Sequence, residues 1–230
     1  MFKRMNFFIK KPLVTYATLL IVSLFNSSCS NEKNYNAEIR GNTMGTFYFI
    51  EVIDVPIEIK IKKIELEIKN SLIKANKILS NWDEKSEISI INKIDKTKAI
   101  KISDELNEVF KTAYEINIKS NGFFDLTLDP IIELWGFGYK NKQMEIIPTD
   151  EQIKKALSLI GQKSLLKNDF ANNELTKKIK NLKINLSSIG KGYGIDLIGR
   201  KLDQLGIKNY IINIGGDILT KGYNSKKENW

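Results

Sequence analysis

Cysteine occurs only once in this 230-residue chain, and histidine does not occur at all. A single cysteine cannot form an internal disulfide, so Cys29 in an exported protein needs another explanation. The sequence also lacks a basic run interleaved with aromatic residues, and nucleic-acid binding needs positive charge clustered along one face. Nucleic acid is therefore not an expected partner, although the formal net charge is +9.

No internal repeat and no long linker rich in proline or glycine divides the chain. Its length is enough for one substantial domain and marginal for two. Hydrophobic residues make up 42% of the sequence and charged residues 27%, which is typical of a globular protein with a real core. We therefore expect a single domain.

The first 28 residues differ from the rest. An apolar run over residues 13–25 follows a basic flank, and no acidic residue occurs before Cys29. This run of 13 residues is too short to cross roughly 30 Å of hydrocarbon as a helix. With small residues Ser27 and Ser28 after it, the pattern predicts a secretory signal peptide over residues 1–28. The basic residues of the flank are Lys3, Arg4, Lys10 and Lys11.

Cys29 would become the new N-terminal residue after removal of such a signal peptide. Lipid modification of this cysteine would anchor the protein to a membrane, because acyl chains bury many methylene groups in a bilayer. We therefore expect a lipid-anchored protein on the periplasmic or extracytoplasmic face of the cell envelope, with residues 29–40 as a polar tether. The alternative is ordinary secretion with a free cysteine, since Asn26 stands where an aliphatic residue is usual.

The remaining residues predict a mixture of helices and strands. Residues 46–55 are β-branched and aromatic and predict a strand. Residues 57–79 carry apolar side chains at helical spacing and predict a long amphipathic helix. The other expected helices are 103–120, 148–161 (with a capping box from Thr149 and Gln152) and 189–205, and the other expected strands are a hairpin within 163–187 and a buried strand at 210–214. These elements predict one α+β domain over residues 41–230, with a mixed sheet and packed helices.

The end of the chain is unusual for such a domain. Residues 221–230 are polar, whereas the strand at 210–214 has the composition of a central strand. A central strand should have later partners to cover its edge. We therefore expect the C-terminal part of the domain to be missing from this sequence.

Two segments near the start of the domain combine glycine or an aromatic residue with small polar residues. In the first, Gly41 and Gly45 flank Met44; glycine lets backbone approach a ligand, and methionine is a soft apolar cover for a flat ring. A tight turn into a strand is the alternative. In the second, Trp82 could stack on a ring, while Asp83 and Ser86 could simply cap turns.

A third segment, residues 122–130, places Phe123 and Phe124 directly before Asp125. Two aromatic rings beside a carboxylate suit a flavin or an adenine, because they offer a ring face and an acceptor. The alternative is an aromatic corner of the core.

The fourth segment, residues 185–194, combines a strand end, a polar turn and a glycine-rich helix start that bears Lys191. Free N–H groups at a helix N-terminus together with a cation favour phosphate binding. The spacing is not that of a Walker A loop. The glycines could instead permit close helix packing.

Taken in order, the segments resemble the ApbE family of FAD:protein FMN transferases. The likeness covers roughly residues 41–222. It is carried by Met-Gly-Thr, W-D-x-x-S-E-I-S with Asn92 following, F-D-L-T-L-D-P with W-G-F-G, L-S-S-I-G-K-G-Y-G-I-D and I-G-G-D. A lipid-modified cysteine after a signal peptide also agrees with this resemblance.

The resemblance implies an enzyme that splits FAD at its pyrophosphate, releases AMP and leaves FMN on a threonine or serine of a target flavoprotein. It implies Mg²⁺ as cofactor, with the backbone carbonyl of Ser188 among its ligands, and a catalytic role for Lys191 near the diphosphate. Asn185 stands where the family usually has aspartate. The residues implied to bind FAD are Met44, Trp82, Phe123, Phe124, Asp125, Asn185 and Lys191.

The sequence departs from the family pattern after residue 222. The family has a later histidine, an Asp-Pro-x-Thr-Gly stretch and the Asp and Thr that complete the metal site, and none of these is present here. The alternatives are therefore a non-catalytic FAD-binding envelope lipoprotein, an inactive fragment, or an FAD pyrophosphatase. Family precedent suggests subunits of Nqr-type sodium-pumping quinone reductases or Rnf-type electron-transfer complexes as targets.

Overall fold

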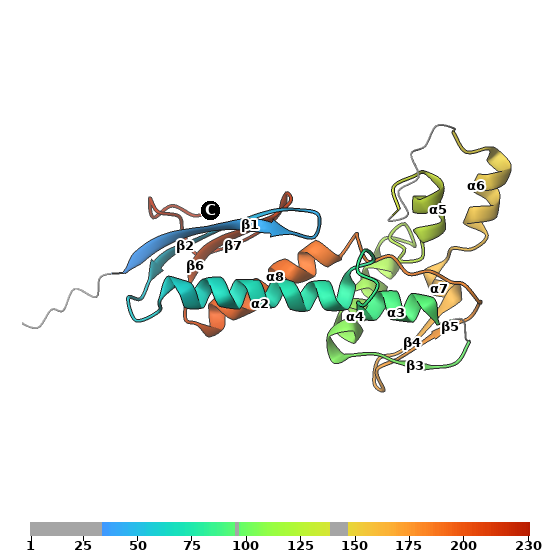
Figure 1. The fold of residues 1–230 in the computed structure, drawn as a ribbon, viewed down its shortest axis with the longest axis horizontal. Helices are drawn as coiled ribbons and strands as arrows, with labels where there is room; N and C mark the ends of the chain where they lie inside the picture. The colour runs from blue at the N-terminus through green and yellow to red at the C-terminus, as the bar shows by residue number, and fades with distance from the viewer. Residues whose placement is uncertain (1–33, 95–96, 139–146) are drawn as a thin grey trace, which may run out of the picture. The chain divides into compact units, whose positions relative to one another are not determined.

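The computed structural model describes residues 34–94, 97–138 and 147–230, so the predicted signal peptide and Cys29 lie outside the described residues. Residues 35–230 combine two antiparallel sheets with helices packed on them (Figure 1). The strands are β1 (Tyr35–Thr43), β2 (Thr46–Val55), β3 (Ile100–Lys101), β4 (Leu166–Asp169), β5 (Glu174–Lys177), β6 (Asn209–Ile214) and β7 (Asp217–Lys221). The helices are α2 (Ile61–Leu79), α3 (Glu87–Lys93), α4 (Asp104–Lys119), α5 (Asp129–Leu134), α6 (Asp150–Leu157), α7 (Gln162–Leu165) and α8 (Gly190–Gln204). Within the described ranges, no helix combines the length and the apolar character needed to cross a bilayer.

The larger sheet has the strand order β1-β2-β6-β7. Its inner face is aliphatic because side chains alternate along each strand. In β2 and β6 the register pairs Ile50 with Ile212 and Val52 with Tyr210, and all four side chains are almost completely buried. The inner face therefore needs a cover of helices.

Helices α2 and α8 provide this cover and lie along the same face of the sheet (Figure 1). Along α2, Ile64, Ile68 and Leu72 recur every four residues and form one buried stripe. On α8, Gly199 permits close approach to the sheet, since a Cβ there would lie 2.9 Å from the Leu219 side chain. The two helices and the sheet enclose one aliphatic core.

A second core lies among α3, α4 and the small sheet, whose strand order is β3-β5-β4. Phe110 of α4 is its largest fully buried side chain. Both helices start at a serine: Ser86 accepts a hydrogen bond from the Ser89 amide and Ser103 from the Leu106 amide. Such caps satisfy N–H groups that a helix leaves free.

The structure confirms the α+β class and most of the long elements expected from the sequence. The strand at 46–55, the helices capped by Ser103 and Thr149, and the helix before Gly206 are all present. The expectation of a mixed sheet is corrected, because every pairing among the described strands is antiparallel. The helix expected to reach Gly161 ends at Leu157, and α3 and α5 were not predicted.

One expectation about the start of the domain is wrong, and one argument about its end does not hold. Residues 35–40, assigned to the tether, belong to β1, whose polar residues point to one face while Ile39 is buried. The strand at 210–214 has a partner on its second edge, because β7 pairs with it along its whole length. The expectation that the C-terminal part of the domain is missing stays a prediction. Strands with many polar residues resemble loops in composition, which explains why β1 and β7 were not predicted.

The central position of β6 predicts a large effect of truncating Ile212. Ile212 is completely buried, whereas Ile218 on β7 is 57% exposed. We expect Ile212→Ala to lower the free energy of unfolding by about 2–5 kcal/mol, because it removes buried methyl groups and leaves a cavity. The matched Ile218→Ala variant should change it by less than about 0.5 kcal/mol. Urea unfolding measures both, and equal losses would contradict the assigned faces of the sheet.

An acidic residue near the end of β2 ties the C-terminal residues to the sheet. The Tyr223 hydroxyl donates to Asp54 Oδ2 at 2.8 Å, and the Lys227 ammonium pairs with the same carboxylate. The hydrogen bond from Lys227, followed by that from Tyr223, lowers the pKa of Asp54. Because the pKa is lower in the folded state, this stabilisation is present above the usual aspartate pKa and is lost as the pH falls through the lowered value.

We therefore expect Asp54→Asn to lower the melting temperature at neutral pH, by an amount that shrinks as the pH falls below about 4. Asparagine tolerates the positive φ of 55° found here, so the backbone should be unaffected. Thermal unfolding between neutral and acidic pH measures the difference, with the exposed Glu58→Gln as the control for net charge. A difference that does not vary with pH would refute the ion pair.

Candidate functional site

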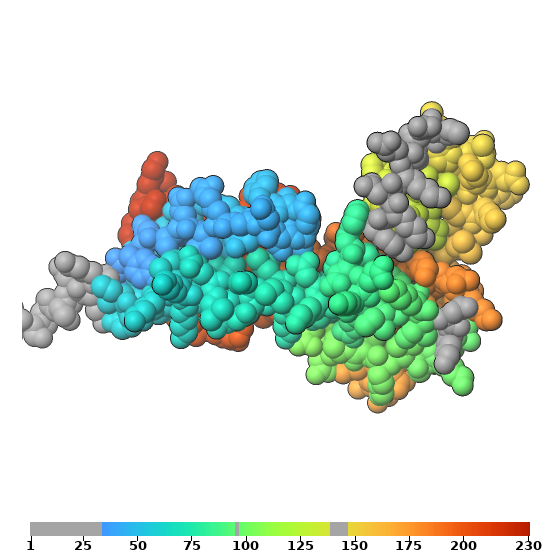
Figure 2. All heavy atoms as spheres, in the orientation of Figure 1, coloured from blue at the N-terminus to red at the C-terminus, as the bar shows by residue number. Residues whose placement is uncertain are grey.

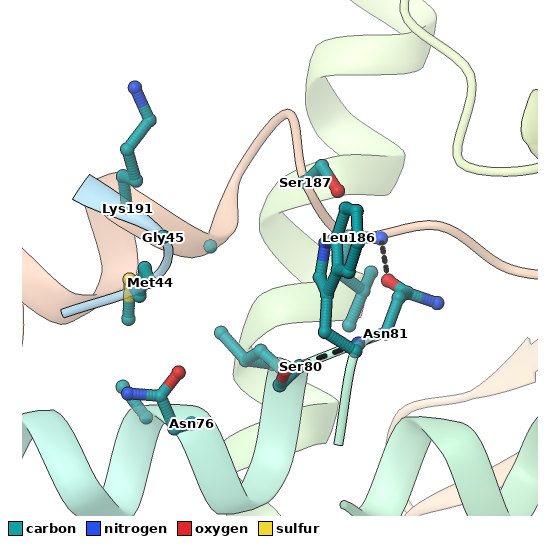
Figure 3. A pocket seen from close by; sticks show the side chains of 12 residues that line it. Met44, Gly45, Asn76, Ser80, Asn81, Leu186, Ser187 and Lys191 are labelled. Atoms are coloured by element: carbon teal, nitrogen blue, oxygen red, sulfur yellow. Dashed lines mark hydrogen bonds between the residues drawn. The ribbon is translucent and has the colours of Figure 1, made fainter. Parts of the chain in front are cut away.

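A cavity of about 620 Å³ opens where the β1–β2 hairpin, the C-terminal end of α2 and the start of α8 meet. In Figure 2 the surface is notched between the hairpin, in blue, and the segment after α2, in green. Figure 3 shows Met44, Gly45 and Lys191 on one side of the cavity and Asn81, Leu186 and Ser187 on the other. The lining residues are Met44, Gly45, Ala75, Asn76, Leu79, Ser80, Asn81, Trp82, Leu186, Ser187, Gly190 and Lys191.

The hairpin tip forms an apolar wall of this cavity. Thr43 pairs with Thr46, so Met44 and Gly45 are the two turn residues, with φ of 49° and 72°. Positive φ at both positions is the pattern of a type I′ hairpin turn. A Cβ on Gly194 of α8 would lie 3.0 Å from Met44 Cε, so the tip rests against this helix. The tight turn expected from the sequence is therefore present, and the Met44 side chain in this turn lines the cavity.

The start of α8 forms the basic wall. Its N-cap residue, Ile189, offers no side-chain hydrogen bond to the first N–H groups. An uncapped helix N-terminus attracts anions. A Cβ on Gly190 or Gly192 would meet no atom within 4 Å, so close helix packing does not explain these two glycines. They leave the first turn open to a ligand.

The Lys191 side chain reaches from this turn toward the connection between β6 and β7. Its Nζ lies 3.5 Å from Asp217 Oδ2 and 3.5 Å from the Gly215 carbonyl oxygen, and a third of the side chain is exposed. Both contacts are long for charged partners, so the ammonium group is weakly held. A ligand anion beside α8 can therefore compete for it.

Trp82 lies at the rim of the cavity and is 64% exposed. Its neighbours Asp83 and Ser86 cap turns, which is the alternative that the sequence offered for them. Asp83 Oδ1 accepts from the Lys85 amide at 2.9 Å, and Ser86 caps α3 while donating to the Ser80 carbonyl at 2.6 Å. Only Trp82 of this segment has an exposed ring available for stacking.

Asn185 and Ser188 precede α8 but do not line the cavity. Asn185 is buried; its Nδ2 donates to Asp129 Oδ1 at 3.0 Å and its Oδ1 accepts from the Ser187 amide at 3.0 Å. Ser188 lies in the exposed turn before the helix. Asn185 thus shapes the turn through its hydrogen bonds, and its predicted contact with the nucleotide stays a prediction.

The aromatic and acidic residues at 123–125 are also outside the cavity lining. Phe123 is 91% exposed, and Phe124 packs against the second core. Asp125 accepts hydrogen bonds from the Thr127 amide at 2.6 Å and the Gln162 amide at 2.7 Å. Its carboxylate therefore joins its own loop to the start of α7, which agrees with the structural alternative. The FAD contacts of all three residues stay predictions.

The expected Mg²⁺ site can be compared with the donors present. Among the described residues, no group of three or more acidic, cysteine or histidine side chains could hold a metal ion. The backbone carbonyl of Ser188 alone does not make a site, since Mg²⁺ takes six oxygen ligands in an octahedron. The described residues therefore do not fit a bound ion by themselves.

Several lining residues were not predicted, above all Asn76, Ser80 and Asn81. Asn76 Nδ2 donates to Thr43 Oγ1 at 3.3 Å and connects α2 to the hairpin. The only available signal was the cluster of small polar residues at the end of the long amphipathic helix. Such clusters also mark ordinary helix ends, so the sequence could not distinguish a cavity wall from a helix stop.

The cavity combines a helix N-terminus and a lysine with an apolar wall and an exposed indole ring. It is suited to a ligand that carries both an anionic group and a flat apolar group, and it lies in an α+β fold. Residues 44–230 match the model of the ApbE family. The chain belongs to the ApbE family.

Individual relatives agree with this assignment. The chain is 35% identical to the FAD:protein FMN transferase of Buchnera aphidicola subsp. Schizaphis graminum, over 91% of this chain and 60% of that protein. It is 32% identical to the Vibrio cholerae protein of the same name, over 95% of this chain and 63% of that protein.

Solved structures of the family have the same fold. The flavin transferase ApbE from Vibrio cholerae superposes with a TM-score of 0.81 at 32% identity, covering 86% of this chain and 63% of that one. The apo flavinyl transferase ApbE of Pseudomonas stutzeri gives a TM-score of 0.78 at 27% identity, covering 86% of this chain and 64% of that one. The chain thus spans somewhat less than two thirds of the length of these relatives.

The hydrogen bond between Asn185 and Asp129 predicts what happens when Asn185 is replaced by aspartate, the residue that the family resemblance implies at this position. We expect Asn185→Asp to lower the free energy of unfolding by about 1–3 kcal/mol at neutral pH, because two buried carboxyl groups would face each other. One of them should take up a proton more readily when folded, so the loss should shrink as the pH falls. Urea unfolding at neutral and mildly acidic pH measures it, with the exposed Asn42→Asp as control. A loss independent of pH would show that the two side chains do not face each other.

Proposed function

We propose that this protein is an FAD:protein FMN transferase. The observation that carries the proposal is that the uncapped start of α8, with Gly190 and Lys191, lines the same cavity as the apolar hairpin tip at Met44 and lies beside it. A dinucleotide has a central diphosphate, which suits the start of α8, and planar rings, which suit the apolar hairpin tip. Membership of the ApbE family supports the same substrate.

In the proposed reaction, the hydroxyl oxygen of a threonine or serine on the acceptor protein attacks the phosphorus on the FMN side of the diphosphate. A new phosphoester bond forms, the bond from this phosphorus to the bridging oxygen breaks, and AMP leaves with the electron pair. The hydroxyl proton passes to solvent or to a base. Negative charge builds up on the leaving phosphate, and Lys191 with the N–H groups of α8 stabilises it.

The apolar parts of the cavity serve to hold the rings. Met44 offers a polarizable side chain, and Trp82 offers an exposed ring face for stacking. We also propose that FAD is contacted by Phe123, Phe124, Asp125 and Asn185, on the basis of family resemblance alone. Their positions outside the cavity lining mean that they would act on a part of the substrate that extends beyond it.

A requirement for Mg²⁺ is part of the proposal. The ion would take oxygen ligands from the diphosphate and from the main chain near Ser188, and it would supply charge neutralisation at the phosphates. Because the described residues do not form a metal site, the measurement that bears on this point is covalent flavin incorporation with and without added Mg²⁺.

We further propose that the protein acts in the cell envelope, anchored through a lipid on Cys29. The signal-like residues 1–28 and the single cysteine support this location. Its targets would be flavoprotein subunits of membrane electron-transfer complexes of the Nqr or Rnf type. Labelling with a radioactive fatty acid would test the anchor, and absence of label from Cys29 would refute it.

The transfer reaction is tested by incubating the full-length protein with FAD, Mg²⁺ and a peptide that carries an acceptor threonine. In-gel flavin fluorescence on the peptide, with an equal amount of AMP released, is the expected result. AMP without labelled peptide would identify an FAD pyrophosphatase instead. FAD binding without AMP would identify a non-catalytic flavin-binding protein.

The role of Lys191 gives a sharper prediction on binding alone. We expect Lys191→Met to weaken FAD affinity by about ten- to a hundred-fold, because a charge-assisted contact contributes about 1.5–3 kcal/mol. Lys201→Met, at the opposite end of the same helix, is the matched control and should change affinity by less than about two-fold. Calorimetric titration with FAD compares the two. Equal affinities for both variants would remove the main support for the proposed site.

A further inference from the structure

The buried segment at 182–186 leads into α8 but belongs to no strand. Leu182, Ile184 and Leu186 are at most 2% exposed, so this stretch of backbone runs through the core. Buried backbone N–H and C=O groups need hydrogen-bond partners, and a segment without a strand neighbour must find them elsewhere. The segment is therefore a point at which side chains determine the path of the chain.

Two asparagine side chains supply these partners. Asn92 Nδ2 donates to the Ile184 carbonyl at 2.8 Å, and its Oδ1 accepts from the Ile184 amide at 2.8 Å. Asn81 Nδ2 donates to the same carbonyl at 2.7 Å, and its Oδ1 accepts from the Leu186 amide at 2.9 Å. Each side chain thus makes two hydrogen bonds to the backbone, as a neighbouring strand would.

Of the two side chains, only Asn81 contacts Leu186, the residue whose carbonyl is bonded to the start of α8. The Leu186 carbonyl accepts hydrogen bonds from the Ile189 amide at 3.1 Å and the Gly190 amide at 2.8 Å. The peptide groups of Leu186 are thus held by Asn81 on one side and by the first turn of α8 on the other. The bonds of Asn92 end two residues earlier, at Ile184.

Asn81 also belongs to the opposite wall of the cavity. It directly follows Ser80, the C-cap of α2, and precedes Trp82 at the rim. The side chain is 8% exposed, and both of its polar atoms are engaged, so it has one defined orientation. Figure 3 shows its hydrogen bond to the Leu186 amide, on the side of the cavity opposite Lys191.

We propose that Asn81 is a positioning residue that fixes the start of α8, and with it Lys191, relative to the α2 and Trp82 wall of the cavity. The proposal rests on the proposed function for its effect on FAD, but its structural part stands independently. Loss of the Asn81 side chain would leave the Leu186 amide without its partner and let the first turn of α8 move. Lys191 would then no longer be held at one distance from the ring-binding wall.

The test compares Asn81→Ala with Asn92→Ala, since each removes two hydrogen bonds to the same buried segment. We expect Asn81→Ala to weaken FAD affinity by about ten-fold or more, whereas Asn92→Ala should stay within about three-fold at a similar loss of melting temperature. If both variants lose affinity equally, in proportion to stability, the proposal is overturned and both residues are merely structural.

A second measurement needs no ligand. Amide hydrogen exchange at Ile189 and Gly190 should accelerate in Asn81→Ala but not in Asn92→Ala. Unchanged exchange in Asn81→Ala would overturn the proposal. If the wild-type protein does not bind FAD, the proposed function fails, and the exchange data still decide whether Asn81 holds the start of α8.

Discussion

The packing of α2 and α8 on the inner face of the β1-β2-β6-β7 sheet is the constraint from which the site follows. Both helices bury aliphatic stripes against the same strands, so their ends are fixed relative to the β1–β2 hairpin. The C-terminal end of α2 and the N-terminal end of α8 then open into one cavity. The cavity therefore lies between two helix ends of opposite polarity.

This difference in polarity suits different regions of the cavity to different parts of a ligand. An anionic group is favoured beside Gly190 and Lys191, whereas a neutral ring is favoured toward Met44 and the end of α2. The hairpin contributes to both regions, since Met44 packs on Gly194 of α8 and Thr43 accepts a hydrogen bond from Asn76 of α2. A change in the sheet would therefore alter the pocket even when no lining residue is replaced.

Local signals predicted much of the fold. The stripe along residues 57–79 predicted α2 to within four residues, and Thr149 was recognised as a cap because capping depends on neighbouring residues alone. For the site, Met44, Trp82 and Lys191 were predicted and do line the cavity. Asn81 could not be predicted, because its partners lie more than a hundred residues away and many buried asparagines look the same in sequence. Asp125 illustrates the converse: beside two aromatic residues it suggested a ligand contact, but Gln162 is its distant partner.

The long contacts of Lys191 have a consequence for how strongly the cavity attracts an anion. With Asp217 at 3.5 Å, the ammonium group already has a negative neighbour. This carboxylate offsets part of the positive charge that an anion at the start of α8 meets, and it also repels the anion. The pair of residues, and not Lys191 alone, therefore sets the electrostatic attraction at this end of the cavity.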